Sequence, residues 1–249
     1  MKELLLSSLV SLSVLIVASC QTRQNESGTT GIFGQEDRVY TEEWPQIGLL
    51  EMTGVGVCTA TIVDTNVIAT AAHCVVSGVP LKFHANFKSA TLAGKTATVT
   101  DVIHNAGGHG STYATAHLDW ALLRIDADLG ADFGILPMLN LRDRTLPISV
   151  QLIGYPDDLR VNGIPKKTSN NAPCHIRTLD NNGLMLHDCD AWGGNSGGPL
   201  LLTEGNTTFV VGFHAGGRRK TFETWTEDDS NRAASAASVL ETLKSGGNP

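Results

Sequence analysis

The sequence predicts an all-β protein with an antiparallel sandwich or barrel architecture. Charged residues make up 17% of the 249 residues, against roughly 25% in an average soluble domain, and Gly occurs 26 times. Such a composition favours many turns and few charge-laced helices. From about residue 44 onward, short apolar segments rich in β-branched residues alternate with turn signals, which is the pattern of many short strands.

The individual elements follow from this alternation. Residues 58–63 and 67–70 flank the turn sequence Asp-Thr-Asn and predict a hairpin. Further strands are expected at 96–103, 121–125, 150–153, 184–186 and 209–213. The end of the chain differs, because an Ala-rich run places Val239, Leu240 and Leu243 on one face and two glycines follow it. This predicts a C-terminal helix at about 230–244.

The N-terminus carries an export signal. Lys2 is followed by an apolar run at 4–18, which is too short to span a bilayer of about 30 Å stably. The run ends Val-Ala-Ser-Cys, which resembles the lipobox of bacterial lipoprotein precursors. The resemblance implies a signal peptide at 1–19 and lipid on Cys20, so that the exported protein is anchored to a membrane, facing the periplasm or the cell surface, or is released. The alternative is an ordinary signal peptide cleaved nearby, with Cys20 lost or left free.

Residues 20–37 are polar and without periodicity, which predicts a flexible tether or a propeptide. The remaining chain is long enough for one large barrel-type domain or two small domains of about 100 residues each. A net charge of −7 without a basic block argues against nucleic-acid binding. A hydrophobic content of 41% excludes disorder and also a multi-span membrane protein.

The sharpest motif surrounds Ser196, in the run Gly-Asn-Ser-Gly-Gly-Pro at 194–199. Glycines on both sides let the backbone turn tightly, expose the hydroxyl and leave peptide N–H groups to point at a developing oxyanion. Taken alone, the run could equally be a Gly-rich turn.

Two further motifs add the partners that a nucleophilic serine requires. His73 stands in Ala-Ala-His-Cys at the end of the predicted hairpin, where a neutral imidazole can act as general base. Asp119 stands in Asp-Trp-Ala-Leu-Leu at the mouth of an apolar strand, where it can hold the imidazole tautomer and stabilise the imidazolium.

The three motifs, in the order His, Asp, Ser, resemble those of the chymotrypsin-like serine proteases. The resemblance implies two antiparallel six-stranded β-barrels packed together, followed by the C-terminal helix. It assigns a protease domain to 38–249, with the first barrel at about 38–130 and the second at about 143–228. It also implies His73 as base, Asp119 as its orienting partner, Ser196 as nucleophile, and the N–H groups of Gly194 and Ser196 as the oxyanion hole.

Other segments resemble the bacterial glutamyl endopeptidase branch of this family, among them Val-Gly-Phe-His-Ala-Gly-Gly at 211–217. The resemblance implies that His214, with Ala215 and Gly216, forms the specificity pocket and binds an acidic side chain. The pattern departs at Ala191, where that branch commonly has a hydroxyl residue. Asp190 stands where trypsin-like members keep the aspartate that binds Lys or Arg, so a basic preference is the competing interpretation.

Asn195 departs from the trypsin-like pattern, because an asparagine cannot supply the charge with which a freed N-terminus pairs in trypsin-like zymogens. Activation by that mechanism is therefore not expected. Cleavage after Arg38, which would expose Val39, is a separate hypothesis based on the position of Arg38 beside the first strand.

The five cysteines divide into Cys20 for lipid and two disulfides that fit the resemblance, Cys58 with Cys74 and Cys174 with Cys189. Metal binding is the rival interpretation, but the four cysteines lack the close pairing of zinc sites. No nucleotide, flavin or metal motif is present, so no cofactor is expected.

The sequence therefore predicts a lipid-anchored, monomeric serine endopeptidase that acts on a protein or peptide substrate through an acyl-enzyme, with the substrate strand adding to the edge around 214–216. One alternative is a degenerate protease-fold lipoprotein that binds peptides without cutting them. The other is a serine esterase, since Gly-x-Ser-x-Gly also fits the α/β-hydrolase elbow. That fold requires the order Ser, acid, His and alternating helices, which this chain does not offer.

Overall fold

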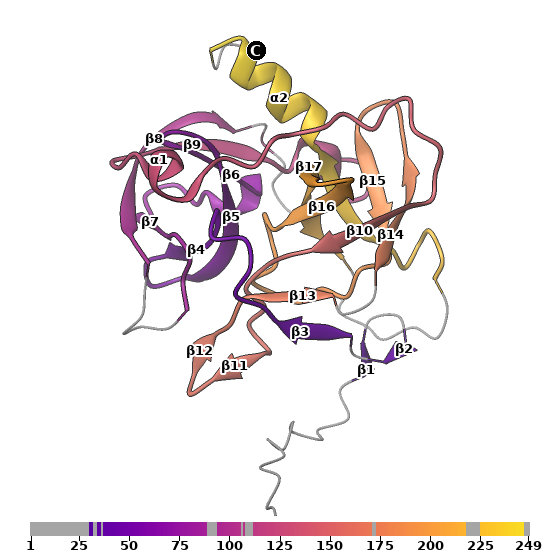
Figure 1. The fold of residues 1–249 in the computed structure, drawn as a ribbon, viewed down its shortest axis with the longest axis horizontal. Helices are drawn as coiled ribbons and strands as arrows, with labels where there is room; N and C mark the ends of the chain where they lie inside the picture. The colour runs from indigo at the N-terminus through magenta and orange to yellow at the C-terminus, as the bar shows by residue number, and fades with distance from the viewer. Residues whose placement is uncertain are drawn as a thin grey trace, which may run out of the picture.

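The computed structural model describes residues 30–31, 34–35, 37–88, 94–105, 107, 112–170, 173–217 and 225–246. Two closed six-stranded barrels lie side by side, and a C-terminal helix packs at one end of the molecule (Figure 1). The prediction of an all-β protein with two antiparallel barrels and a terminal helix is confirmed.

The first barrel runs in the strand order β4-β5-β6-β9-β8-β7, and every neighbouring pair is antiparallel. Its strands are β4 (Ile47–Met52), β5 (Gly56–Asp64), β6 (Val67–Thr70), β7 (Leu81–His84), β8 (Thr96–Asn105) and β9 (Ala121–Ile125). The predicted hairpin is the β5–β6 pair, joined through Thr65 and Asn66.

The second barrel runs in the order β10-β14-β15-β18-β17-β16, again antiparallel throughout. Its strands are β10 (Ile148–Leu152), β14 (Cys174–Leu179), β15 (Leu184–His187), β16 (Pro199–Glu204), β17 (Thr207–Gly216) and β18 (Asn231–Ser235). The helix α2 (Ala236–Lys244) follows β18 directly, and Ser235 caps it by accepting a hydrogen bond from the Ala237 amide.

Short elements connect and flank the barrels. A 3₁₀ turn, η1 (Ala72–Cys74), follows β6, and a second, η2 (Ala116–Leu118), precedes β9. The short helix α1 (Leu129–Phe133) begins the link between the barrels. Near the N-terminus lie β1 (Thr30–Gly31), β2 (Gly34–Gln35) and β3 (Arg38–Tyr40). The β11 (Arg160–Val161) and β12 (Ile164–Pro165) hairpin precedes β13 (Thr168–Asn170), which pairs with β3 (Figure 1).

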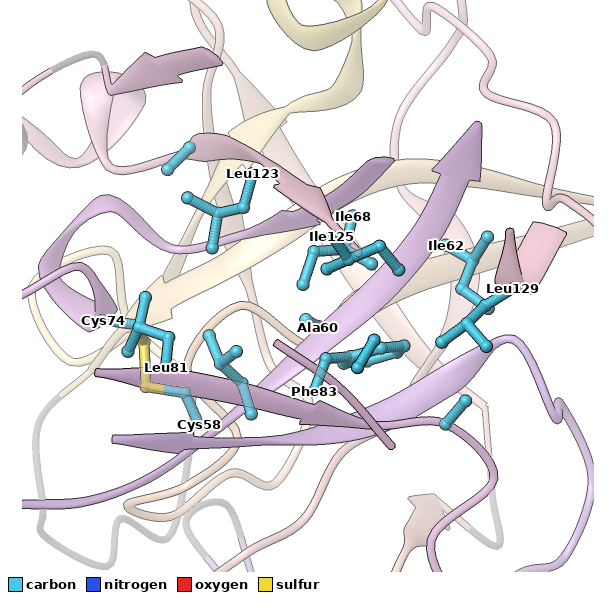
Figure 2. Close-up of a cluster of buried hydrophobic side chains, with 14 of the residues drawn as sticks. Cys58, Ala60, Ile62, Ile68, Cys74, Leu81, Phe83, Leu123, Ile125 and Leu129 are labelled. Carbon is cyan, nitrogen blue, oxygen red and sulfur yellow. A yellow bond between two sulfur atoms is a disulfide. The ribbon is translucent and has the colours of Figure 1, made fainter. Parts of the chain in front are cut away.

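Of the four buried apolar clusters in the described part of the chain, the three larger ones hold this arrangement together. One fills the first barrel with side chains such as Leu50, Ile62 and Phe83, and includes the sulfurs of Cys58 and Cys74 (Figure 2). Another fills the second barrel around Val150 and Ile176. The third contains residues of both halves, Ile47 and Trp120 from the first with Phe213 and Val239 from the second. The two barrels therefore pack against each other through a shared apolar cluster.

Strand β5 is buried on both of its faces, and its side chains on both faces are apolar or small. Cys58, Ala60 and Ile62 point into the first barrel, so the alternating residues Thr59, Thr61 and Val63 face the opposite side. Val63 belongs to the cluster between the barrels, and all six residues are buried. The strand therefore carries the centre of the first barrel into contact with the second.

The structure corrects the expected start of the helix. Residues 231–235 form β18, the strand that closes the second barrel between β15 and β17, and the helix begins at Ala236. Ala234 pairs with Leu184 on one side and Phe213 on the other. This sheet pairing outweighs the helix propensity of the Ala-rich run, because propensity is small beside the burial and ladder hydrogen bonds of a closed barrel.

The barrel limits also differ from the expected ranges of 38–130 and 143–228. The first barrel uses residues 47–125, since β3 pairs with β13 of the second half. The second barrel uses 148–216 together with 231–235. Cys20 and the segment that resembles a lipobox lie outside the described residues. Within the described part, no helix is long and apolar enough to span a membrane.

Both expected disulfides are present. Cys58 is bonded to Cys74 and Cys174 to Cys189, across sequence separations of 16 and 15 residues. A loop of this size corresponds to about 3 kcal/mol of stabilisation in the chain-entropy treatment. Each bond lies within one barrel, so each constrains its own half of the fold.

Candidate active site

His73 is held at the end of β6 by two constraints. It lies in the turn η1, and the next residue, Cys74, is covalently tied to Cys58 of β5. The carboxylate of Asp119 then accepts two hydrogen bonds from His73, one from the backbone amide at 2.9 Å and one from Nδ1 at 2.7 Å. Both the backbone and the ring of the histidine are therefore positioned by the same side chain.

This pair fixes the histidine tautomer. Asp119 follows η2 immediately before β9, and its side chain is fully buried, whereas that of His73 is 30% exposed. An ionised carboxylate can only accept, so Nδ1 carries the proton and Nε2 is left with a lone pair. The His73 ring is therefore held in one orientation by the buried Asp119 carboxylate, with Nε2 able to accept a proton.

Ser196 lies in a tight turn between β15 and β16 that packs against the His73 segment. The Ser196 carbonyl accepts a hydrogen bond from the Thr59 amide at 2.8 Å and lies 3.9 Å from Cys74 Sγ. The Gly197 amide donates to His214 O at 2.8 Å. The turn therefore joins the first barrel to β17, with Ser196 partly exposed between them.

Two glycines make this turn possible. Gly194 has φ +95° and Gly197 has φ +78°, backbone conformations that other residues rarely adopt. A Cβ on Gly197 would overlap Thr70 Oγ1 and the Thr59 carbonyl and lie 2.7 Å from the Ala71 amide nitrogen. Within the described part of the chain, the amides of Gly194 and Ser196 donate to no protein acceptor, which is the condition for an anion-binding pair of N–H groups.

His214 lies on β17 next to the serine turn and is bonded to a second buried histidine. His187 Nε2 and His214 Nδ1 are 3.1 Å apart, and the two side chains are 0% and 3% exposed. Burial lowers the pKa of His187 to about 4. Burial, followed by the charges of His187, His73 and Arg232, lowers the pKa of His214 well below its usual value. Both rings are thus neutral at physiological pH.

Of the other predicted specificity residues, Ala215 and Ala191 are also buried, and Gly216 is partly exposed. Ala215 packs with Leu184 and Leu186, and Ala191 belongs to the core of the second barrel. Gly216 has φ +138°, and the register of the β17–β18 pairing shifts between His214 and Gly216. The structure therefore brings His214, Ala215 and Gly216 together at one end of β17, with Ala191 in the neighbouring core.

Asp190 contacts the N-terminal segment. Its side chain is buried, and Oδ2 accepts a hydrogen bond from the Asp37 amide at 3.3 Å. Asp37 is held in turn by Asn170 Nδ2, which donates to Asp37 Oδ1 at 2.8 Å. Arg38 forms a bidentate pair with Asp158. This part of the chain packs against the second barrel, so at least one Asp190 oxygen is engaged there.

Residues 58–224 match the family of the trypsin-like peptidase domain. The chain belongs to this family. Membership makes the protein a serine endopeptidase, an enzyme that hydrolyses peptide bonds. A comparison with curated protein sequences finds no match.

Solved structures of serine proteases share the fold of this peptidase. A Glu endopeptidase, solved in complex with MPD, superposes with a TM-score of 0.70 at 20% identity over 87% of this chain and 99% of that one. A thermostable serine protease AL20 from an extremophilic microorganism gives 0.60 at 20% identity, over 84% and 100%. Protease Anisep from Arthrobacter nicotinovorans gives 0.61 at 14% identity, over 84% and 98%.

The sequence analysis of this trypsin-like peptidase missed three residues at the site. His187 could have been noticed as a lone histidine that ends an otherwise apolar strand, but its partner His214 is 27 residues away. Thr59 sits inside an apolar run and gives no signal of its own. Asp37 lies at the end of the expected tether, and its contact with Asp190 spans 153 residues.

One cluster among the described residues places metal-ligand atoms close together. It consists of Cys58, His73 and Cys74, whose ligand atoms lie within 4.8 Å of one another. Its two sulfurs are joined in a disulfide and provide no thiolate. The cysteines therefore hold the His73 segment in place through their disulfide.

Proposed function

We propose that this peptidase cleaves peptide bonds through an acyl-enzyme, with Ser196 as nucleophile, His73 as general base and Asp119 as the residue that orients the base. The observation that carries the proposal is the double hydrogen bond from His73 to the buried Asp119 carboxylate. Because Nδ1 is committed to Asp119, Nε2 is the atom available to take the Ser196 proton.

The reaction then follows from these groups. Ser196 Oγ attacks the substrate carbonyl while its proton passes to His73 Nε2, and Asp119 stabilises the imidazolium. The N–H groups of Gly194 and Ser196 stabilise the oxyanion, an interaction for which the loss of one donor costs about 3 kcal/mol. Nε2 returns the proton to the leaving amine as the C–N bond breaks. Water repeats the sequence on the ester and releases the acid.

An alkyl fluorophosphonate probe tests this proposal without knowledge of the substrate. The mature protein is expected to be labelled on Ser196, and the label should be absent from Ser196→Ala. His73→Ala and Asp119→Asn are expected to slow labelling by about 10³-fold or more, because they remove the base or its tautomer. Folded wild-type protein that fails to label would be a binding protein rather than an enzyme of this mechanism.

We further propose that the preferred residue before the cleaved bond is Glu or Asp. His214 supports this, because its Nδ1 is bonded to His187 and its Nε2 is the ring atom left for a substrate carboxylate. Asp190, the residue that would favour Lys or Arg, has Oδ2 engaged by the Asp37 amide. The solved structure that superposes with a TM-score of 0.70, at 20% identity, is that of a Glu endopeptidase.

A digest of a random peptide library tests the specificity. We expect cleavage after Glu or Asp, reduced more than tenfold by His214→Ala, with the same acidic preference retained by Asp190→Asn. A preference for Lys or Arg that disappears in Asp190→Asn would make Asp190 the determinant and reject the acidic assignment.

We also propose that the mature peptidase is tethered to a membrane through lipid on Cys20, because the residues before it fit a lipobox. Two chains of a lipid anchor bind a membrane stably, whereas one chain binds only marginally. Cys20→Ser should release the protein into the soluble fraction with its fluorophosphonate labelling intact. A Cys20→Ser protein that stays in the membrane fraction would contradict the anchor.

A further inference from the structure

Thr59 occupies the point where the first barrel touches the loop that carries Ser196. It lies on β5 and is 0% exposed. Thr59 Oγ1 donates a hydrogen bond to Gly194 O at 2.8 Å and accepts one from the Tyr155 amide at 3.0 Å. A hydroxyl has a single proton, and an amide can only donate, so the direction of both bonds is fixed. The proton of Thr59 is committed to the Gly194 carbonyl.

The backbone of Thr59 holds the same loop a second time. Its amide donates to Ser196 O at 2.8 Å, and its own carbonyl accepts a hydrogen bond from Thr70 Oγ1 at 2.8 Å. The carbonyls on either side of Asn195 are therefore both bonded to one residue of the first barrel. All of these atoms are in buried residues except for Ser196, which is partly exposed.

The two N–H groups of the proposed oxyanion hole are oriented through the carbonyls that precede them. In a planar trans peptide, C=O and N–H point in opposite directions. The Gly193 carbonyl accepts a hydrogen bond from the Asp157 amide at 2.7 Å, which turns the Gly194 N–H away from Asp157. The Asn195 carbonyl accepts one from the Gly198 amide at 2.8 Å, which turns the Ser196 N–H away from Gly198.

Between these two peptides lies the Gly194–Asn195 peptide, which forms a hydrogen bond with Thr59. The Gly194–Asn195 peptide has its carbonyl on Thr59 Oγ1 and its N–H on Trp192 O at 3.0 Å. Rotation of this central peptide would move Gly194 and Ser196 relative to each other. Gly194 has no Cβ and φ +95°, so its own conformational preferences do not prevent the rotation. The restraint must come from its hydrogen-bond partners.

We infer that Thr59 is a positioning residue, which holds the 193–196 loop in the conformation where the N–H groups of Gly194 and Ser196 converge on the oxyanion. The inference rests on the proposed function, since it concerns the same reaction. It also explains how the loop is held with Asn195 in place of a carboxylate: the anchor is a neutral hydroxyl from the other barrel. The chain needs no ion pair at residue 195 for this purpose.

The test compares Thr59→Val with Thr59→Ser by the kinetics of alkyl fluorophosphonate labelling. Valine keeps the shape and removes the hydroxyl, whereas serine keeps the hydroxyl. We expect the limiting inactivation rate of Thr59→Val to fall by about 10- to 100-fold, below the 10²–10³-fold effect of removing an oxyanion donor outright. The probe's reversible binding constant should change by less than about threefold, and Thr59→Ser should stay within about threefold of wild type.

Thr61→Val is the matched control, because Thr61 lies on the same strand, is equally buried and has a hydroxyl without a partner in the described part of the chain. It should label at the wild-type rate. Thr59→Ala repeats the test with a smaller side chain if the valine variant does not fold. Wild-type labelling by a folded Thr59→Val, or an equal loss in Thr61→Val, would overturn the inference. Failure of the wild type itself to label would instead reject the proposed function.

Discussion

Gly197 is a residue of the serine turn that leaves no room for a side chain. Its φ of +78° disfavours any other residue, and a Cβ would overlap Thr70 and Thr59. We expect Gly197→Ala to lower the free energy of unfolding by about 2–5 kcal/mol, as the sum of the costs of the left-handed conformation and of overpacking. The fluorophosphonate labelling rate should fall as well, because the overlap pushes on the strand that holds the 193–196 loop. Urea unfolding measures the first effect.

Gly163 provides the control for this substitution. It has φ +77°, and a Cβ there would meet nothing within 4 Å. Gly163→Ala therefore carries only the conformational cost of about 1–2 kcal/mol. Equal losses in the two variants would mean that the close packing at Gly197 does not matter.

The residues proposed to carry the chemistry could be predicted from local sequence because the backbone around each one requires special residue types. A serine turn with φ above zero on both sides of Ser196 selects glycine, and the disulfide beside His73 selects cysteine. The residues that support them do not stand in a sequence motif that would predict their roles. Thr59, His187 and Asp37 act through partners that lie far away in the chain, so their roles follow only from the fold.

At the scale of elements, the hairpin of β5 and β6 was the easiest to predict. Its two apolar segments flank a polar turn, and the register is set by that turn. Strands β4, β7, β14 and β16 are not singled out by the sequence pattern. Their buried faces vary from the continuous run of β4 to the alternation of β14, because each strand meets a different set of neighbours.

The end of the second barrel shows how tertiary contacts override local preference. Residues 233–238 form one uninterrupted run of Ala and Ser, yet its first half ends a strand and its second half begins a helix. The gap between β15 and β17 has to be filled for the barrel to close, and β18 pairs with both. Ser235 is the last residue of β18, and its hydroxyl caps the helix that begins at Ala236, where helical propensity takes over.

The whole molecule is held by contacts between its halves. Besides the shared apolar cluster, the single proton of the Tyr155 hydroxyl is shared between the Phe87 and Ile47 carbonyls, at 3.0 and 3.3 Å. The same loop supplies the Tyr155 and Asp157 amides, which bond to Thr59 and Gly193. The joint between the barrels and the support of the proposed active site are therefore one structure, so damage to either is expected to affect both.

Global stability should depend on pH through the two histidines buried in the second barrel. Burial lowers the pKa of His187 to about 4, partly offset by Asp188 and the Arg232 backbone, and the pKa of His214 is lowered in the same sense. Between pH 6.5 and 4 the unfolded chain binds a proton at His187 that the native state does not, so stability falls as the pH falls. The loss from His187 alone is about 3 kcal/mol by pH 4.

Urea unfolding of the wild type and His187→Gln between pH 7 and pH 4 measures this effect. The variant should have a shallower dependence of the unfolding free energy on pH, by about one proton across the window. Comparing the two proteins removes the contribution of carboxylates common to both. Parallel curves would show that His187 does not remain neutral in the native state.

The sequence by itself, with the family resemblance that its motifs carry, predicted the class of fold, the disulfide pairs, and the residues proposed as base, orienting partner and nucleophile. It could do so because tight turns, disulfides and strand alternation impose residue types locally. Only the tertiary structure decided where the first barrel starts, that residues 231–235 complete the second, that Asp190 meets Asp37, and that Thr59 forms hydrogen bonds with Gly194 and Ser196. Those features depend on which distant segments meet, and the free energy that selects them comes from burial and hydrogen bonds between barrels, which no local pattern records.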